Sequence, residues 1–189
     1  MKYYKEHYQE YIESTITNNM KDNYQIVEKY LHKGDRILDV GFGSARDMLY
    51  FQDKGYQVCG IDIEDGFINH ARSLHLNVEK QDIRTYESDE KFHLIYCSAS
   101  LLHLKREEII PTIKRLMIHL EKNGIFFLSM KYSEKEDGYD EKGRYFTYFH
   151  QKDIDAFPFR CIEKTITEDK NREHLKWINL VLKNETDPQ

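Results

Sequence analysis

The sequence has few cysteines and no long apolar run. Its three cysteines, Cys59, Cys97 and Cys161, are far apart and odd in number. We therefore expect reduced, mostly buried thiols, with neither a disulfide framework nor a metal site. No apolar run approaches the ~20 residues that span a bilayer, and the charged, acid-containing start is not typical of a signal peptide. These absences predict a cytoplasmic protein without a membrane partner.

Prolines are also scarce, and linkers are absent. Only three prolines occur, and no repeat, low-complexity tract or Pro/Gly/Ser-rich linker divides the 189 residues. We therefore expect a single domain over 1–189. Hydrophobic residues make up 40% of the chain, which argues against disorder despite 32% charged residues. A net charge of −5 lacks the basic excess of a dedicated nucleic-acid binder. The sequence carries no signal for an oligomeric state.

The apolar pattern changes near residue 34. Residues 3–31 have helical spacing with a break near Asn18, which predicts two helices. Short apolar runs then alternate with helical segments, and this predicts a mostly parallel α/β sheet with helices on both faces. The predicted strands are 37–40, 58–61, 76–78, 94–97 and 125–128. Two last runs, 161–166 and 177–182, have no helix between them and predict an antiparallel hairpin that closes the sheet.

These elements predict three regions. We expect an N-terminal helical cap over 1–33, a core of alternating strands and helices over 34–131, and a variable segment with the closing strands over 132–189. Within the core, Ser44 is predicted to cap a helix with Asp47 as its capping-box partner, and Gly55 to end that helix. Pro111 is expected in the first turn of a later helix, because proline suits that position.

A glycine-containing turn follows the first predicted strand. Gly41 and Gly43 stand between this strand and a helix, and their missing Cβ atoms let a ligand approach the backbone. Asp62 ends the next strand, about 20 residues later, where an acidic group can accept both hydroxyls of a ribose. A dinucleotide fingerprint requires a third small residue, but this chain has Arg46 there. Asp39, at the end of the first strand, instead favours a ligand with a cation such as an α-ammonium group.

Over residues 36–131 these motifs resemble the class I S-adenosyl-L-methionine (SAM)-dependent methyltransferases, in the family's order. The segment Leu120–Gly124 resembles the family's turn before the fifth strand. The resemblance implies a Rossmann-like fold and methyl transfer from SAM, with S-adenosyl-L-homocysteine (SAH) as product. The cofactor-binding residues that it implies are Asp39, Gly41, Phe42, Gly43, Arg46, Asp62, Ile63, Asp82, Ile83 and Ser98.

Several alternatives stay open at these positions. Phe42 is larger than the family's usual residue and is expected to narrow the cofactor pocket, which leaves open a catalytically silent SAM/SAH-binding sensor or partner subunit as the alternative. Asp82 is also placed to cap a helix N-terminus, and Arg46 to pair with a neighbouring acid. No Asp/Asn-Pro-Pro-aromatic motif follows the fourth strand. We therefore expect a small-molecule acceptor, loosely as in tellurite-type enzymes, ahead of a tRNA or protein acceptor.

The acceptor side offers weaker signals. His103 follows the loop that faces the methyl group in the resembled family, so it is a candidate general base, with a structural role as the alternative. The candidate substrate contacts are Tyr11, Lys131, Arg144 and Tyr145. We also expect residues 1–15 and 132–149 to form a mobile cover over the pocket, because both segments lie outside the predicted sheet and are rich in aromatic residues.

Overall fold

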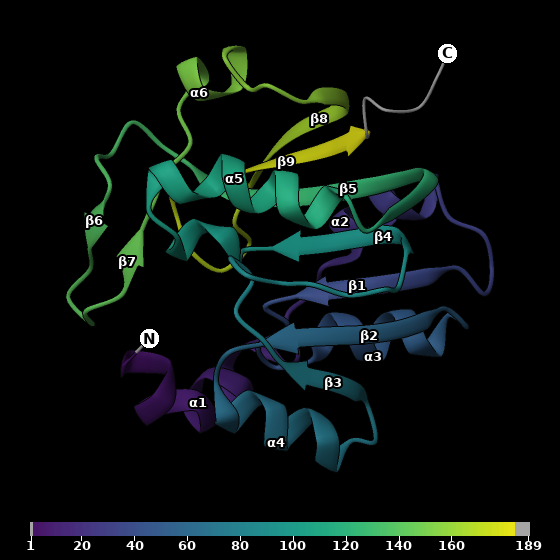
Figure 1. Ribbon diagram of the computed structural model, residues 1–189. Helices are drawn as coiled ribbons and strands as arrows, with labels where there is room; N and C mark the ends of the chain where they lie inside the picture. Colours follow the sequence, from purple (N-terminus) through teal and green to yellow (C-terminus); the bar gives the residue numbers. More distant parts are fainter. Residues whose placement is uncertain (1, 184–189) are drawn as a thin grey trace.

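The computed structural model describes residues 2–183 and contains a seven-stranded sheet in the order β3-β2-β1-β4-β5-β9-β8 (Figure 1). The strands are β1 (Arg36–Val40), β2 (Gln57–Asp62), β3 (Asn77–Lys80), β4 (Phe92–Ser98), β5 (Leu120–Tyr132), β8 (Arg160–Glu168) and β9 (Lys176–Lys183). The first five pair in parallel, whereas β9 is antiparallel to both β5 and β8. The predicted mostly parallel sheet and its closing antiparallel hairpin are confirmed.

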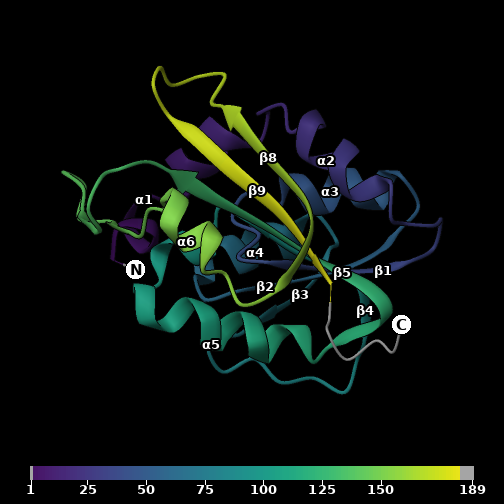
Figure 2. The same ribbon diagram turned by 90° about the horizontal axis from the view of Figure 1, so that it is seen from above.

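Helices cover both faces of this sheet (Figure 2). The helices are α1 (Lys2–Thr15), α2 (Lys21–Glu28), α3 (Arg46–Asp53), α4 (Asp65–Ser73), η1 (Leu101–His103), α5 (Arg106–Met117) and α6 (Gln151–Asp155). Successive side chains of β1 point to opposite faces of the sheet. Ile37 packs with residues of α2 and α3 on one face, whereas Leu38 and Val40 pack with residues of α5 on the other. The break predicted near Asn18 falls between α1 and α2.

The connection after β5 contains structure that the sequence does not predict. The short strands β6 (Gly138–Tyr139) and β7 (Tyr145–Phe146) pair as an antiparallel ribbon beyond the end of β5 (Figure 1). Thr147 anchors the ribbon, because its amide donates to the carbonyl of Leu102 at 2.8 Å and its hydroxyl to that of Leu104 at 2.7 Å. The connection is therefore tied to the loop that follows β4.

Two details of the predicted helix ends are wrong. Ala45, with φ 62°, occupies the N-cap of α3, and Ser44 makes no capping hydrogen bond there. Asp47 instead accepts hydrogen bonds from Arg46 and Tyr24.

Pro111 lies inside α5 and not in its first turn. The start of this helix is set by the carboxylate of Glu108, which accepts a hydrogen bond from the amide of Lys105 at 2.9 Å. The missing N–H of Pro111 costs α5 one bond to the carbonyl of Glu107. The predicted end of α3 at Gly55 is confirmed by its φ of 88°.

The three cysteines are free thiols with different exposure. Cys97 is buried and Cys59 is half-buried. Cys161 is exposed on β8, so the expectation of mostly buried thiols is wrong at this position. Among residues 2–183, no helix combines the length and the apolar character that crossing a membrane requires.

Candidate functional site

The turn after β1 brings bare backbone against the loop that follows β4. Gly41 adopts φ 70°, and its amide donates to the carbonyl of Ile61 at 2.8 Å. A Cβ atom on Gly41 would lie 2.6 Å from the Cβ of Ser100, closer than two carbon atoms can pack. Gly43 also adopts a positive φ, of 53°. The turn therefore requires glycine at position 41 and favours it at position 43, as the sequence pattern indicates.

Asp39 stands at the end of β1 with one carboxylate oxygen unpaired. Its side chain is 2% exposed, and its Oδ2 has no hydrogen-bond partner within the described part of the chain. Burial, together with the nearby carboxylate of Asp47, raises the pKa of Asp39 well above its ordinary value, although Arg46 opposes this shift. Because an unpaired buried carboxylate is costly, this arrangement fits a ligand that supplies a cationic donor.

Asp62 is held at the end of β2 by backbone amides. Gly43 donates to Oδ2 at 3.1 Å and Glu64 donates to Oδ1 at 3.0 Å. A carboxylate can accept about four hydrogen bonds, so these amides fix the side chain and leave capacity for the hydroxyls of a ribose. The next residue, Ile63, is 48% exposed. It offers an apolar surface beside Asp62 on which a flat ring can lie.

Asp82 lies beyond the end of β3 and is engaged by a neighbour. The guanidinium of Arg84 donates to both of its oxygens, and the amide of Arg84 donates to Oδ1 at 2.9 Å. The ion pair with Arg84 lowers the pKa of Asp82. Ile83, between them, packs against the hydrophobic core. Asp82 thus closes a turn and does not cap a helix, and contact with a cofactor there stays a prediction.

Arg46 pairs with the acid beside it. Its Nε and Nη2 donate to the two oxygens of Asp47 at 2.9 and 2.8 Å, and its Nη1 donates to the carbonyl of Thr15 at 3.3 Å. Tyr24 donates to the same carboxylate at 2.6 Å. Arg46 therefore connects α1 and α2 to the start of α3, and its side chain also lines the cavity described below.

Phe42 points away from the glycine turn into the core. Its side chain is 6% exposed and packs with Met48 and residues of α4. A Cβ atom on Gly60 would lie 2.7 Å from Cδ1 of Phe42, so a glycine in β2 makes room for the ring. Phe42 is not among the residues that line the cavity. Phe42 thus packs in the core against α3 and α4, and its effect on a bound cofactor stays a prediction.

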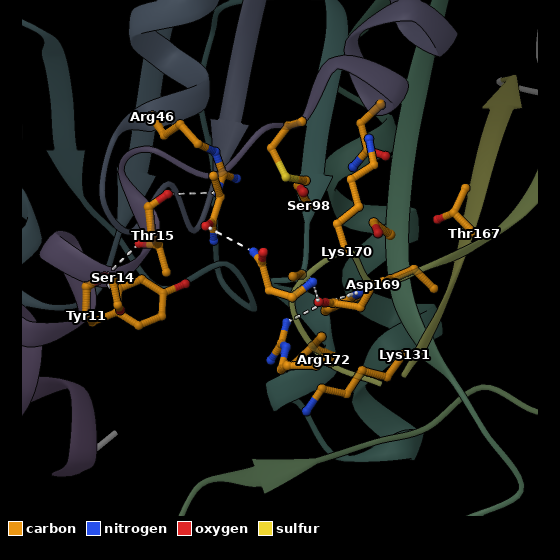
Figure 3. A pocket seen from close by; sticks show the side chains of 18 of the residues that line it. Tyr11, Ser14, Thr15, Arg46, Ser98, Lys131, Thr167, Asp169, Lys170 and Arg172 are labelled. Atoms are coloured by element: carbon orange, nitrogen blue, oxygen red, sulfur yellow. Dashed lines mark hydrogen bonds and ion pairs between the residues drawn. The ribbon is translucent and has the colours of Figure 1, made fainter. Parts of the chain in front are cut away.

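A cavity of about 810 Å³ lies at the carboxyl ends of β4 and β5, between α1, the β6–β7 ribbon and the β8–β9 turn. Figure 3 shows side chains from these separate elements around it. The cavity brings together these residues that the sequence singles out: Tyr11, Arg46, Ser98, His103, Lys131 and Arg144. Tyr145 does not line the cavity, because its ring packs against Tyr139 with centroids 5.3 Å apart.

Helix α1 separates this cavity from the glycine turn. Cε1 of Tyr11 is 3.1 Å from the place that a Cβ on Gly43 would take, and the ring of Tyr8 covers Gly66 of α4. The other predicted cofactor residues consequently lie outside the cavity lining. The N-terminal helix covers the predicted cofactor site, as expected from the sequence.

His103 is a neutral, fully hydrogen-bonded side chain. Its Nδ1 lies 2.8 Å from the carbonyl of Tyr145, so this nitrogen carries the proton, and its Nε2 accepts from the hydroxyl of Tyr4 at 2.9 Å. Burial lowers the pKa of His103 to about 4. These contacts fit the structural role that the sequence analysis gave as the alternative for His103. To act as a general base, His103 would first have to lose its hydrogen bond from Tyr4 at Nε2.

The sequence interpretation misses one wall of the cavity. The β8–β9 hairpin contributes Thr167, the turn from Asp169 to Arg172, Trp177 and Asn179. Lys170 pairs with Asp22 at 2.8 Å, and Asn171 bonds Asn18 at 3.3 Å, which joins this turn to the N-terminal helices. The sequence contains one indication of this wall, because Asn179 interrupts an otherwise apolar strand. A polar residue at a buried position of this kind often has a binding or structural role.

A protein-family model matches the middle of the chain. Residues 37–124 match a family described as "Methyltransferase domain". Among curated proteins, the chain is similar to the "Putative methyltransferase YqeM" of Bacillus subtilis (strain 168), with 28% identity over 117 residues. The match covers 58% of this chain and 47% of that protein, so the chain spans about half the length of this relative.

Solved structures share the fold at low sequence identity. A 1,6-didemethyltoxoflavin-N1-methyltransferase of Burkholderia thailandensis, with bound 1,6-didemethyltoxoflavin and S-adenosylhomocysteine, superposes with a TM-score of 0.77 at 16% identity, covering 94% of this chain and 83% of that one. TehB of Haemophilus influenzae gives a TM-score of 0.70 at 18% identity, covering 93% of this chain and 66% of that one. The Rossmann-like fold is therefore established across the sheet and its helices.

Proposed function

Because residues 37–124 match the methyltransferase domain family, we propose that this chain transfers a methyl group from SAM to a small-molecule acceptor and releases SAH. The observation that carries the proposal is the unpaired Oδ2 of buried Asp39 beside the glycine turn. SAM and SAH both carry the α-ammonium group that this oxygen fits. The methyltransferases with similar folds, one of them with SAH bound, support the same reaction.

The residues of the first two strand ends suit the parts of this cofactor. Asp39 would hold the ammonium group, the glycine turn would lie against the methionine chain, and Asp62 would accept from the ribose hydroxyls. Ile63, exposed beside Asp62, would contact one face of the adenine. Tyr11 lies against Gly43 and must move aside or share this space, so α1 would adjust when the cofactor binds.

The bound cofactor supplies a methyl group that its sulfonium already makes electrophilic. The work left to the chain is to hold the acceptor in line and to exclude water, and orientation of this kind contributes roughly 7–11 kcal/mol. Tyr4, Leu102 and Phe146 wall the cavity with large apolar or aromatic surfaces that suit this task. The neutral His103 does not itself take a proton while Tyr4 occupies Nε2.

Cofactor binding is tested by changing Asp39. We expect Asp39→Asn to weaken SAH binding by about 10- to 100-fold, because the ammonium group loses a charged acceptor. The control is Asp53→Asn, at an exposed position of α3, which should bind SAH normally. Isothermal titration calorimetry measures both. Tight binding of NAD by the wild-type protein, without any response to SAH or SAM, would contradict the proposal.

Turnover separates catalysis from silent binding. The protein is incubated with SAM and a cell extract divided into a small-molecule fraction and a macromolecular fraction, and SAH is measured by mass spectrometry. SAH formation with the small-molecule fraction supports the proposal. Formation only with macromolecules would indicate a tRNA or protein acceptor, and binding without turnover in either fraction would indicate a sensor or partner subunit.

A further inference from the structure

The floor of the cavity is a polar row on the β5–β9 part of the sheet. Ser129 of β5 pairs in register with Asn179 of β9, and Lys131 pairs with Trp177 two residues on. Side chains two residues apart lie on the same face of a strand, and all four residues line the cavity. Ser129 is 3% and Asn179 is 1% exposed. A buried polar floor of this kind is suited to a polar ligand.

Lys131 is the unusual member of this row. Its side chain is 9% exposed, and it makes no ion pair with an acid of residues 2–183. Its Nζ lies 3.3 Å from the ring centroid of Phe146, so a cation–π contact takes the place of a carboxylate. Burying an ammonium group without a carboxylate is costly, and a ring face compensates only part of that cost.

The half-buried cations around the cavity already have acidic partners. Arg46 pairs with Asp47, and Arg144 pairs with Asp140 at 2.7 Å. The more exposed Arg172 and Lys170 pair with Asp169 and Asp22. Lys131 therefore differs from these residues, because it is a buried cation without an acidic partner in the part of the chain that the structure describes. Figure 3 shows Lys131 across the cavity from Tyr11 and Arg46.

The groups that face Lys131 make its surroundings positive. Arg144 and Lys135, from the connection after β5, and Arg172, from the β8–β9 turn, disfavour its charged form, whereas Asp140 favours it. Burial is the larger cause, and together these effects lower the pKa of Lys131 to about 8. The ammonium form therefore still predominates at neutral pH, and a bound anion would relieve the repulsion among these cations.

We propose that Lys131 is the specificity-determining residue for the acceptor, which is a small organic anion whose acidic group pairs with this ammonium. The rings of Tyr4, Phe146 and Trp177, which line the same cavity, would contact its carbon skeleton. This inference rests on the proposed function for the statement that the anion is the methyl acceptor. The anion site itself depends only on the cavity.

Benzoate and its neutral analogue benzamide are the probes. Trp177 is the single tryptophan of the chain and lines the cavity, so its fluorescence reports occupancy. We expect the wild-type protein, with saturating SAH present, to bind benzoate about tenfold or more tightly than benzamide. Lys131→Met should abolish this preference and Lys131→Arg should retain it. Lys152→Met, at an exposed position of α6, is the matched control and should behave as wild type.

The pH dependence follows from the ammonium group. Benzoate affinity should be level below pH 8 and fall about tenfold per pH unit well above it, as Lys131 loses its proton. Lys131→Arg should remove this fall. Circular dichroism and thermal unfolding check that each variant is folded.

Four outcomes would overturn the inference. They are equal binding of benzoate and benzamide, a preference that survives in Lys131→Met, displacement of benzoate by SAH, and equally tight binding of sulfate in place of benzoate. The third would mean that the anion site belongs to the cofactor. If SAH does not bind at all, the proposed function fails, and the titration without SAH still tests the anion site.

Discussion

Asp39 shows how a residue that suits a ligand costs the protein stability. Its pKa is raised in the folded state, mainly by burial, so folding disfavours the ionised form that the unfolded chain adopts above its ordinary pKa of 3.8. The folded state therefore loses stability as the pH rises from 3.8 through the raised pKa. The ammonium group that we propose Asp39 binds would offset this cost.

Asp39→Asn should therefore raise the unfolding temperature of the ligand-free protein at pH 8, because it removes the buried carboxylate. The gain should shrink as the pH falls toward 4, where Asp39 also becomes neutral. Differential scanning calorimetry at the two pH values measures this. An equal gain at both would mean that the substitution acts through packing and not through charge.

Residues close in sequence are those whose place was predictable. Asp39, Gly41 and Gly43 share one turn, and Asp62 ends the adjacent strand, so a local pattern is enough to bring them together. The contact between Tyr4 and His103 joins residues 99 positions apart. The contact between Lys131 and the ring of Phe146 likewise depends on how the connection after β5 folds back over the sheet. The spacing of residues in the sequence does not reveal this fold.

At the scale of elements, strands and helices with clear periodicity were predicted and short ones were not. All seven strands of the main sheet correspond to apolar runs, whereas β6, β7 and α6 are too short to show a period. Pro111 misled the prediction of where α5 starts, because a proline inside a helix is an exception to its usual position.

Helix α1 and the β6–β7 ribbon meet above the cavity. The guanidinium of Arg144 lies 5.0 Å from the ring of Tyr3, and Tyr4 bonds His103. Residues 2–15 contribute no fully buried side chain to this contact, so little apolar burial holds α1 in place. We therefore expect these two elements to shift when a cofactor binds.

Limited trypsin digestion tests this movement. Cleavage of the ligand-free protein should occur first near Lys135 or Lys142, which are exposed in the connection after β5, and should slow when SAH is added. Cleavage at Lys164, exposed on β8, is the internal control and should not respond. Identical rates at Lys142 with and without SAH would contradict a cover that orders around the ligand.

At the scale of the whole molecule, the strand order places the site. The strand order reverses between β1 and β4: β2 and β3 follow on the side of β1, and β5, β9 and β8 follow on the side of β4. Ligands of open α/β sheets bind beyond the carboxyl ends of the strands at such a point. Asp39, Ser98 and the cavity all lie there. The sequence predicted this architecture because alternating strands and helices permit few other topologies.

A ligand bound at this point contacts several strand ends together and should stabilise the whole fold. SAH at about 100 times its Kd should add ~2.7 kcal/mol to the free energy of unfolding. Urea unfolding, followed by circular dichroism, measures the difference, with NAD as the control that should leave the midpoint unchanged. A midpoint that SAH does not move would indicate that it does not select the native state.

The position of β9 also sets the order in which this protein can fold during synthesis. β9 lies between β5 and β8, although it follows both in the chain. While a ribosome is still making residues 176–183, β5 has an open edge and β8 has no strand to pair with. The parallel part of the sheet can form earlier, but the polar floor of the cavity cannot, because Asn179 and Trp177 arrive with this strand. A growing chain would therefore acquire its glycine turn first and the polar floor of its cavity last.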